Sequence, residues 1–178
     1  MAVIPRPDVI KLVAVGDGGV GKTTMLNVLV KGIYDDETKM TVGFDIFSKE
    51  VLIDGRAYSV VIWDLGGQDR FKFFLHQEND IFIKGTQGVL LIFDLTRFQP
   101  LEEFKFWVNL CRKENFNIPI LLIGSKLDLD EQIVYKDSDL EEMKEEFKCI
   151  EWIRISSKTR ENLDKIFKLI LTPILKSN

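Results

Sequence analysis

Residues 16–23 carry the pattern best suited to chemistry. They read Gly-Asp-Gly-Gly-Val-Gly-Lys-Thr, which fits the phosphate-loop pattern of a glycine, any four residues, then glycine, lysine and serine or threonine. Glycines let backbone N–H groups approach a phosphate chain closely. Lys22 would neutralise phosphate charge, Thr23 would offer a hydroxyl to Mg²⁺, and the helix beginning near Gly21 would point its positive dipole end at the phosphates. The predicted nucleotide contacts are Asp17, Gly18, Gly19, Val20, Gly21, Lys22, Thr23 and Thr24.

The loop also has the strand and helix that such a motif requires. Residues 9–15 are apolar and β-branched, which is typical of a buried strand. A core-facing helix is predicted from apolar residues at helical spacing, Leu26, Leu29, Val30 and Ile33. A glycine-rich turn without a ligand is the alternative for the eight residues alone, and this setting argues against it.

Composition predicts a single domain over residues 1–178, because the chain is 46% hydrophobic and no boundary or repeat interrupts it. The net charge is -4, with 24 basic and 28 acidic residues interleaved, so we expect no nucleic-acid partner. Cys111 and Cys149 lie in apolar segments and are predicted to be buried, reduced thiols.

Membrane attachment by the chain itself is not expected. There is no signal-peptide pattern and no apolar run of about 18 residues. Ala2 stands where myristoylation needs glycine, and no cysteine near the end could be prenylated. We expect a cytoplasmic monomer that reaches membranes through partners.

The order of elements predicts an α/β fold. Strands are expected at residues 44–53 and 57–64, joined by a hairpin turn at Asp54-Gly55, and then at 88–93, 118–123 and 149–155 with helices between them. This is the pattern of a P-loop NTPase three-layer sandwich, with a six-stranded, mainly parallel sheet, one antiparallel edge strand and about five helices.

Two later helices are predicted from apolar stripes that face the core, and a third from an acidic run at residues 139–147 with a solvated face. The stripes are Phe104, Trp107, Val108 and Cys111, and Leu163, Ile166, Phe167, Ile170, Leu171 and Ile174.

Polar groups fall where strands end, at the edge of an open sheet where ligands bind. Asp64 ends the third predicted strand, Lys126 and Asp128 follow the fifth, and residues 156–158 follow the sixth. With the phosphate loop, these segments predict one composite site.

The chain resembles the Ras-like small GTPases from residue 9 to about residue 175. Residues 63–68, Trp-Asp-Leu-Gly-Gly-Gln, match the D-x-x-G-Q motif in its Arf-like wording, and residues 41–45, Thr-Val-Gly-Phe-Asp, look like a Rab-type effector loop. The motifs are therefore mixed between the two subfamilies.

This resemblance implies a switch between GTP and GDP that depends on Mg²⁺. Thr23, Thr41 and Asp64 would bind the metal, Asp64 through water. Gly67 would donate its N–H to the γ-phosphate, and Gln68 would orient the attacking water. Contacts from Thr41 and Gly67 would exist with GTP and be lost with GDP. The implied catalytic residues are Gln68, Lys22 and Gly67.

Guanine would be recognised by Asp128, since a carboxylate can accept hydrogen bonds from N1–H and N2–H together. Lys126 would lie along the base, Ser157 would offer its backbone N–H to O6, and Tyr34 would pack against the ring. Ser125 replaces the family's asparagine, which predicts binding weaker by about 1 kcal/mol. The base-side residues are Tyr34, Ser125, Lys126, Asp128, Ser156, Ser157 and Lys158.

Gly18 leaves room for an arginine supplied in trans by a GTPase-activating protein, and no arginine lies between Lys31 and Asp45. We therefore expect slow intrinsic turnover, roughly 10⁻⁴ to 10⁻² per second. An exchange factor and effector proteins would be the other partners at the switch surface.

The segment after Gln68 is about four residues longer than the family's usual spacing. It is rich in phenylalanine. We expect some of these rings to pack in the core, and the others, with Trp63 and Ile46, to form a surface that binds partners. His76 is expected to be an exposed polar residue. The phenylalanines are Phe71, Phe73, Phe74 and Phe82.

Two other functions remain open. A nucleotide-locked module would bind GTP with negligible turnover, which Gln68, Gly18 and Thr41 disfavour and Ser125 mildly favours. An ATP-dependent kinase or transferase on the same core is disfavoured because no acceptor pocket or arginine-rich lid is evident.

Overall fold

A computed structural model describes residues 8–35, 40–69, 72, 81–113 and 115–176. Its six strands form one sheet in the order β2-β3-β1-β4-β5-β6. All pairings are parallel except that of β2 with β3, so the one antiparallel strand lies at an edge, as predicted. The strands are β1 Asp8–Val15, β2 Phe44–Ile53, β3 Arg56–Leu65, β4 Gly88–Asp94, β5 Ile120–Ser125 and β6 Glu151–Arg154.

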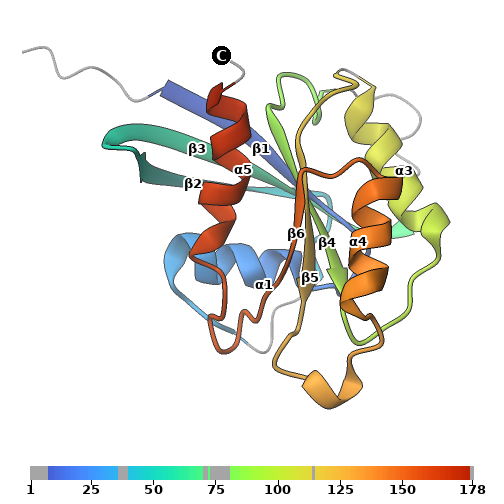
Figure 1. Cartoon of the computed structure of the whole chain (residues 1–178). Coiled ribbons are helices and arrows are strands. Elements are labelled where there is room, and N and C mark those ends of the chain that lie inside the picture. The colour runs from blue at the N-terminus through green and yellow to red at the C-terminus, as the bar shows by residue number, and fades with distance from the viewer. Residues whose placement is uncertain (1–7, 36–39, 70–71, 73–80, 114, 177–178) are drawn as a thin grey trace, which may run out of the picture.

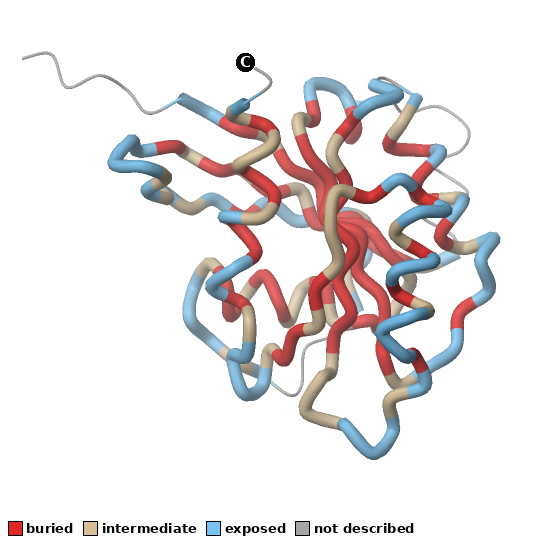
Figure 2. Tube along the Cα trace, in the orientation of Figure 1, coloured by how far each residue is buried: buried red, intermediate tan, exposed pale blue. Residues whose placement is uncertain are grey.

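Burial explains why the central strands are almost uniformly apolar. Every residue of β4 and β5 is buried, because helices cover both faces of the sheet there (Figure 2). The β2–β3 ribbon is partly exposed instead, and its tight turn has positive φ at Asp54 (50°) and Gly55 (79°). This is the hairpin turn that the sequence predicts.

Helices α1 (Lys22–Leu26) and α5 (Lys165–Lys176) pack on one face of the sheet, and α3 (Leu101–Arg112) and α4 (Asp137–Glu146) on the other (Figure 1). The three-layer prediction is confirmed. The described residues contain four α-helices. In addition, Asn27–Lys31 continues α1 as a π-helix and Asp130–Gln132 is a single 3₁₀ turn. No helix in these ranges is long and apolar enough to cross a bilayer.

The apolar stripes predicted for α3 and α5 are confirmed, since all of their residues are buried. The stripe predicted for the first helix is wrong at its end. Leu26 and Leu29 are buried, but Ile33 is 59% exposed. Gly32 has a φ of 71°, a left-handed conformation that ends the helix, so Ile33 lies beyond the face that packs on the sheet.

The predictions for Ala2, Phe71, Phe73, Phe74 and His76 lie outside the described residues. Phe82 is described and is buried at 7% exposure.

Cys111 and Cys149 are free and buried, as expected, and burial raises the pKa of each thiol to about 12.

We expect neither thiol of the folded chain to react with a thiol reagent such as DTNB at pH 8, and both to react after unfolding in guanidinium chloride. Because thiols of the unfolded chain ionise near pH 9, the free energy of unfolding should fall as pH rises above that value. Rapid stoichiometric labelling of the folded chain would contradict this burial.

Candidate functional site

The predicted segments meet around one cavity of about 370 Å³. Its walls come from the loops that follow β1, β3, β5 and β6 and from the segment before β2, which confirms that the motifs gather at the carboxyl ends of the strands. The lining residues are Gly18, Gly19, Gly21, Lys22, Thr23, Thr24, Tyr34, Asp35, Met40, Thr41, Gly67, Gln68, Ser125, Lys126, Asp128, Leu129, Ser157 and Lys158.

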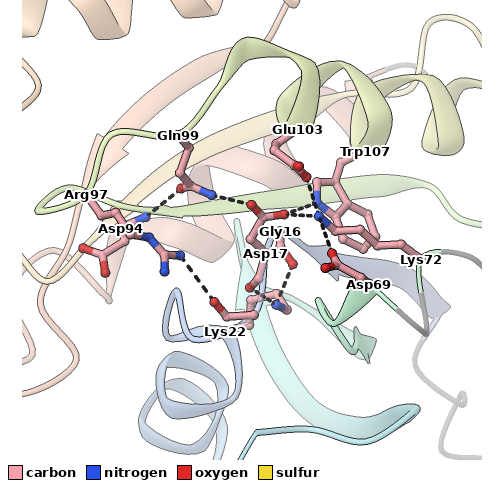
Figure 3. Close-up of polar contacts among 11 residues, drawn as sticks. Gly16, Asp17, Lys22, Asp69, Lys72, Asp94, Arg97, Gln99, Glu103 and Trp107 are labelled. Carbon is pink, nitrogen blue, oxygen red and sulfur yellow. Dashed lines mark hydrogen bonds and ion pairs between the residues drawn. The ribbon is translucent and has the colours of Figure 1, made fainter.

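Four residues predicted for the site do not line this cavity. Val20, Asp64 and Ser156 are fully buried behind it. Asp17 belongs to the phosphate loop, but its side chain is directed toward α3 (Figure 3).

Lys22 is the buried cation of the site, with 5% of the residue exposed. Its ammonium group donates hydrogen bonds to the carbonyl oxygens of Gly16 (2.7 Å) and Asp17 (2.8 Å), so the phosphate loop wraps around it. Burial lowers its pKa to about 8, although the carboxylates of Asp64 and Asp17 oppose the shift. An anion in the adjoining cavity would stabilise the charged form.

Gly67 touches the phosphate loop through its backbone. A Cβ placed on it would lie 2.2 Å from the carbonyl carbon of Asp17 and 2.4 Å from the nitrogen of Gly18, so no side chain fits there. Gly66 donates its N–H to the carbonyl of Gly43 at 2.8 Å. The segment carrying Gln68 is therefore seated on both the phosphate loop and the segment that leads into β2.

Three oxygen-bearing side chains meet beside the cavity. The hydroxyl oxygens of Thr23 and Thr41 are 2.6 Å apart, and Thr23 donates to Oδ2 of Asp64 at 2.5 Å. The other carboxylate oxygen, Oδ1, is buried and has no hydrogen-bond partner among the described residues, and burial raises the pKa of Asp64. Hydroxyl and carboxylate oxygens suit Mg²⁺, which keeps several waters when bound, so these residues fit the predicted metal.

Ser125 is buried and connects β5 to the phosphate loop. Its hydroxyl lies 2.5 Å from the carbonyl oxygen of Val20 and 2.9 Å from that of Phe93. Ser125 therefore links the end of β5 to the phosphate loop. Both acceptors are backbone carbonyls, so this hydrogen is directed into the protein and away from a base.

The loops after β5 and β6 are fixed by polar contacts that orient Asp128. Oδ1 of Asp128 accepts a hydrogen bond from Ser156 at 2.6 Å, and the backbone N–H of Leu127 donates to Ile155 at 2.9 Å. Lys126 has a positive φ of 66° and pairs with Asp94 at 2.5 Å. The stem of Lys126 thus lies in the cavity wall while its charge is paired.

A polar cluster joins the phosphate loop to α3 (Figure 3). The Asp17 carboxylate pairs with Lys72 at 2.6 Å and accepts hydrogen bonds from Gln99 (2.9 Å) and Trp107 (3.3 Å). Lys72 also pairs with Glu103 of α3. Burial alone would raise the pKa of Asp17, but Lys72 and the two hydrogen bonds hold it below its usual value.

The sequence did not predict the partner of Lys126, which is Asp94, or the partners in the Asp17 cluster. Asp94 ends a buried strand at the carboxyl edge of the sheet, the same signal that marked Asp64, and could have been found. Lys72, Gln99 and Glu103 carry no such signal, because their partners are distant in the sequence.

Comparison with known proteins decides the family. The family model for the Ras family matches residues 11–176. The chain belongs to the Ras family. Similar proteins include the Ras-related protein Rab-34 of Mus musculus, 33% identical over 88% of this chain, and the Ras-related protein RABA1a of Arabidopsis thaliana, 30% identical over 93%. The Ypt/Rab-type GTPase YPT7 of Saccharomyces cerevisiae is 28% identical over 97%.

This Ras-family chain is thus a Ras-like small GTPase, as its motifs predicted. These three relatives are all Rab-type by name. The matched region spans 60% of Rab-34, 75% of RABA1a and 85% of YPT7.

The position of Ser125 generates a prediction for this small GTPase. We expect Ser125→Ala to accelerate GDP release by about fivefold, because the Val20 carbonyl loses its hydrogen-bond donor and a typical net hydrogen bond contributes about 1 kcal/mol. Ser125→Asn should slow release by a similar factor if its longer amide reaches the base as well. Stopped-flow displacement of a fluorescent GDP measures both release rates. If both rates were unchanged, the hydrogen bond from Ser125 to Val20 would have no effect on nucleotide binding, contrary to this prediction.

Proposed function

We propose that this chain, as a single domain over residues 1–178, is a molecular switch that binds GTP or GDP with Mg²⁺, hydrolyses GTP slowly and binds partners in its GTP state. The observation that carries the proposal is the single cavity shared by the phosphate loop, by Thr41, by Gly67 and Gln68, and by the loops containing Asp128 and Ser157. Each segment brings a group suited to one part of a guanine nucleotide with its metal.

The base would bind between the loops that follow β5 and β6. The hydrogen bond from Ser156 orients the Asp128 carboxylate, so that it can accept from N1–H and N2–H of guanine. Adenine offers no such donor pair, which favours GTP over ATP. Lys126 and Tyr34 line the same cavity and would pack along the base.

The phosphates would lie over Lys22, and their charge would favour its protonated form. Thr23, Thr41 and Asp64 would hold the Mg²⁺, which when bound neutralises charge on the outer phosphates. The γ-phosphate would hold Thr41 and Gly67 in place. Its loss would release the segments before β2 and after β3, and that release would be the switch.

Hydrolysis needs orientation and charge stabilisation more than covalent participation. Gln68 lines the cavity next to Gly67 and would orient the attacking water. Gly18 lines the cavity and has no side chain, so an activating protein could insert an arginine there. We expect the isolated chain to turn over at roughly 10⁻⁴ to 10⁻² per second.

Partners in the GTP state would bind beside the moving segments. The rings of Phe44 and Trp63 stack with centroids 5.3 Å apart, and Phe82 packs edge-on against both. Exposed Val42 and Ile46 extend this apolar area. Because the relatives are Rab-type proteins, we propose a role in vesicle trafficking, with membrane recruitment from the cytoplasm through an exchange factor and effectors.

Gln68→Leu tests the hydrolytic role. We expect single-turnover hydrolysis of bound GTP to fall at least tenfold, while GTP affinity changes little, because leucine cannot orient water. Radiolabelled phosphate release measures the rate, and Gln132→Leu in the turn after β5 is the matched control. A wild-type rate near zero that Gln68→Leu leaves unchanged would favour the nucleotide-locked module instead.

Asp128→Asn tests base recognition. An amide can donate to one base edge position and accept from another, so the variant should lose affinity for GDP by at least about a hundredfold and gain relative affinity for xanthosine diphosphate, which carries a carbonyl in place of the amino group. Competition against a fluorescent nucleotide measures both affinities. Equal loss for both nucleotides would mean that Asp128 acts on loop structure alone.

A further inference from the structure

Arg97 lies in the connection between β4 and α3 and reaches the phosphate loop. Its guanidinium Nη2 donates to the carbonyl oxygen of Gly18 at 3.4 Å, across 79 positions in the sequence. Figure 3 shows the side chain extending from this connection toward the loop. The contact is long and the residue is exposed, and it uses one of the five donors that a guanidinium has.

The backbone on both sides of Arg97 is fixed. Oδ1 of Asp94 accepts from the backbone N–H of Thr96 at 2.9 Å and from its hydroxyl at 2.7 Å. On the other side, Gln99 donates from its backbone to the hydroxyl of Tyr135 and from its side chain to Asp17, both at 2.9 Å. A well-anchored backbone that carries an exposed cation is suited to charge stabilisation at a nearby ligand.

Arg97 shares a second cavity, of about 610 Å³, with Gly18, Gly67 and Gln68. Those three residues also line the first cavity, so the two are contiguous at the end where Gln68 lies. Arg97 therefore lines a cavity that adjoins the proposed nucleotide site at the end where the γ-phosphate would lie. The segment of residues 31–45 has no arginine, whereas Arg97 reaches the site from the connection between β4 and α3.

We propose that Arg97 is a catalytic residue that contacts the γ-phosphate during hydrolysis, an inference that rests on the proposed GTPase function. Water attacks the γ-phosphorus as its bond to the β–γ bridging oxygen breaks, giving GDP and phosphate. Arg97 donates hydrogen bonds to the oxygens that gain negative charge and undergoes no covalent change. Arginine contributes strongly to such transition states, and an arginine of the same chain is associated with rates on the order of 10⁻² per second.

The test is single-turnover hydrolysis by Arg97→Ala and Arg97→Lys, with Arg56→Ala as the control. Arg56 is an exposed arginine of the β2–β3 hairpin that pairs with Asp8, so its loss changes the net charge equally. We expect Arg97→Ala to hydrolyse GTP at least tenfold more slowly than wild type with GDP release changed less than twofold. Arg97→Lys should stay slow, because a point charge cannot make the paired contacts of a guanidinium.

A second readout uses the complex of GDP with aluminium fluoride, which mimics the transferring phosphoryl group. Calorimetry should show that wild type and Arg56→Ala bind fluoride-activated GDP more tightly than GDP without an activating protein, and that Arg97→Ala loses this gain. A hydrolysis rate for Arg97→Ala within twofold of the wild-type rate would overturn the inference. If that variant also released GDP faster, Arg97 would serve to anchor the phosphate loop instead. If wild type binds GTP but shows no turnover dependent on Gln68, the proposed function fails first.

Discussion

The buried ammonium group of Lys22 is the interaction on which the site depends. Burial of a charge is costly unless carbonyls or counter-charges surround it. The carbonyls of Gly16 and Asp17 supply two hydrogen bonds, and the Asp64 carboxylate adds charge, yet the pKa still falls to about 8. The loop is thus shaped around a cation that an additional anion would stabilise, which is the physical reason for assigning phosphates to this end of the cavity.

Other contacts keep the phosphate loop in position around Lys22. Asp17 links the loop to α3 through Lys72, Gln99 and Trp107. Ser125 links it to β5. Lys72 also accounts for the placement of Gln68, since it follows Gln68 by four residues and its backbone N–H donates to the Gln68 carbonyl at 3.0 Å. The phosphate loop is therefore connected to α3, to the segment that carries Gln68 and to the end of β5.

Much of this arrangement follows from local patterns in the sequence. Alternating strands and helices predict the parallel sheet, and a parallel sheet brings the ends of its strands to one edge, so Asp64 and Asp128 could be placed in one site. Contacts between distant side chains could not be predicted. The pairing of Lys72 with Asp17 and the bond from Arg97 to Gly18 depend on how α3 and its preceding connection pack. Ile33 was misplaced because the helix ends at Gly32, whose φ is 71°.

Binding of a guanine nucleotide in the cavity beside Lys22 is the property from which the proposed switch follows. The most direct measurement is to denature the freshly purified chain and identify the released small molecules by ion-pair chromatography and mass spectrometry. We expect GDP or GTP at close to one equivalent per chain. Release of adenine nucleotides in that amount, with no guanine nucleotide, would contradict it.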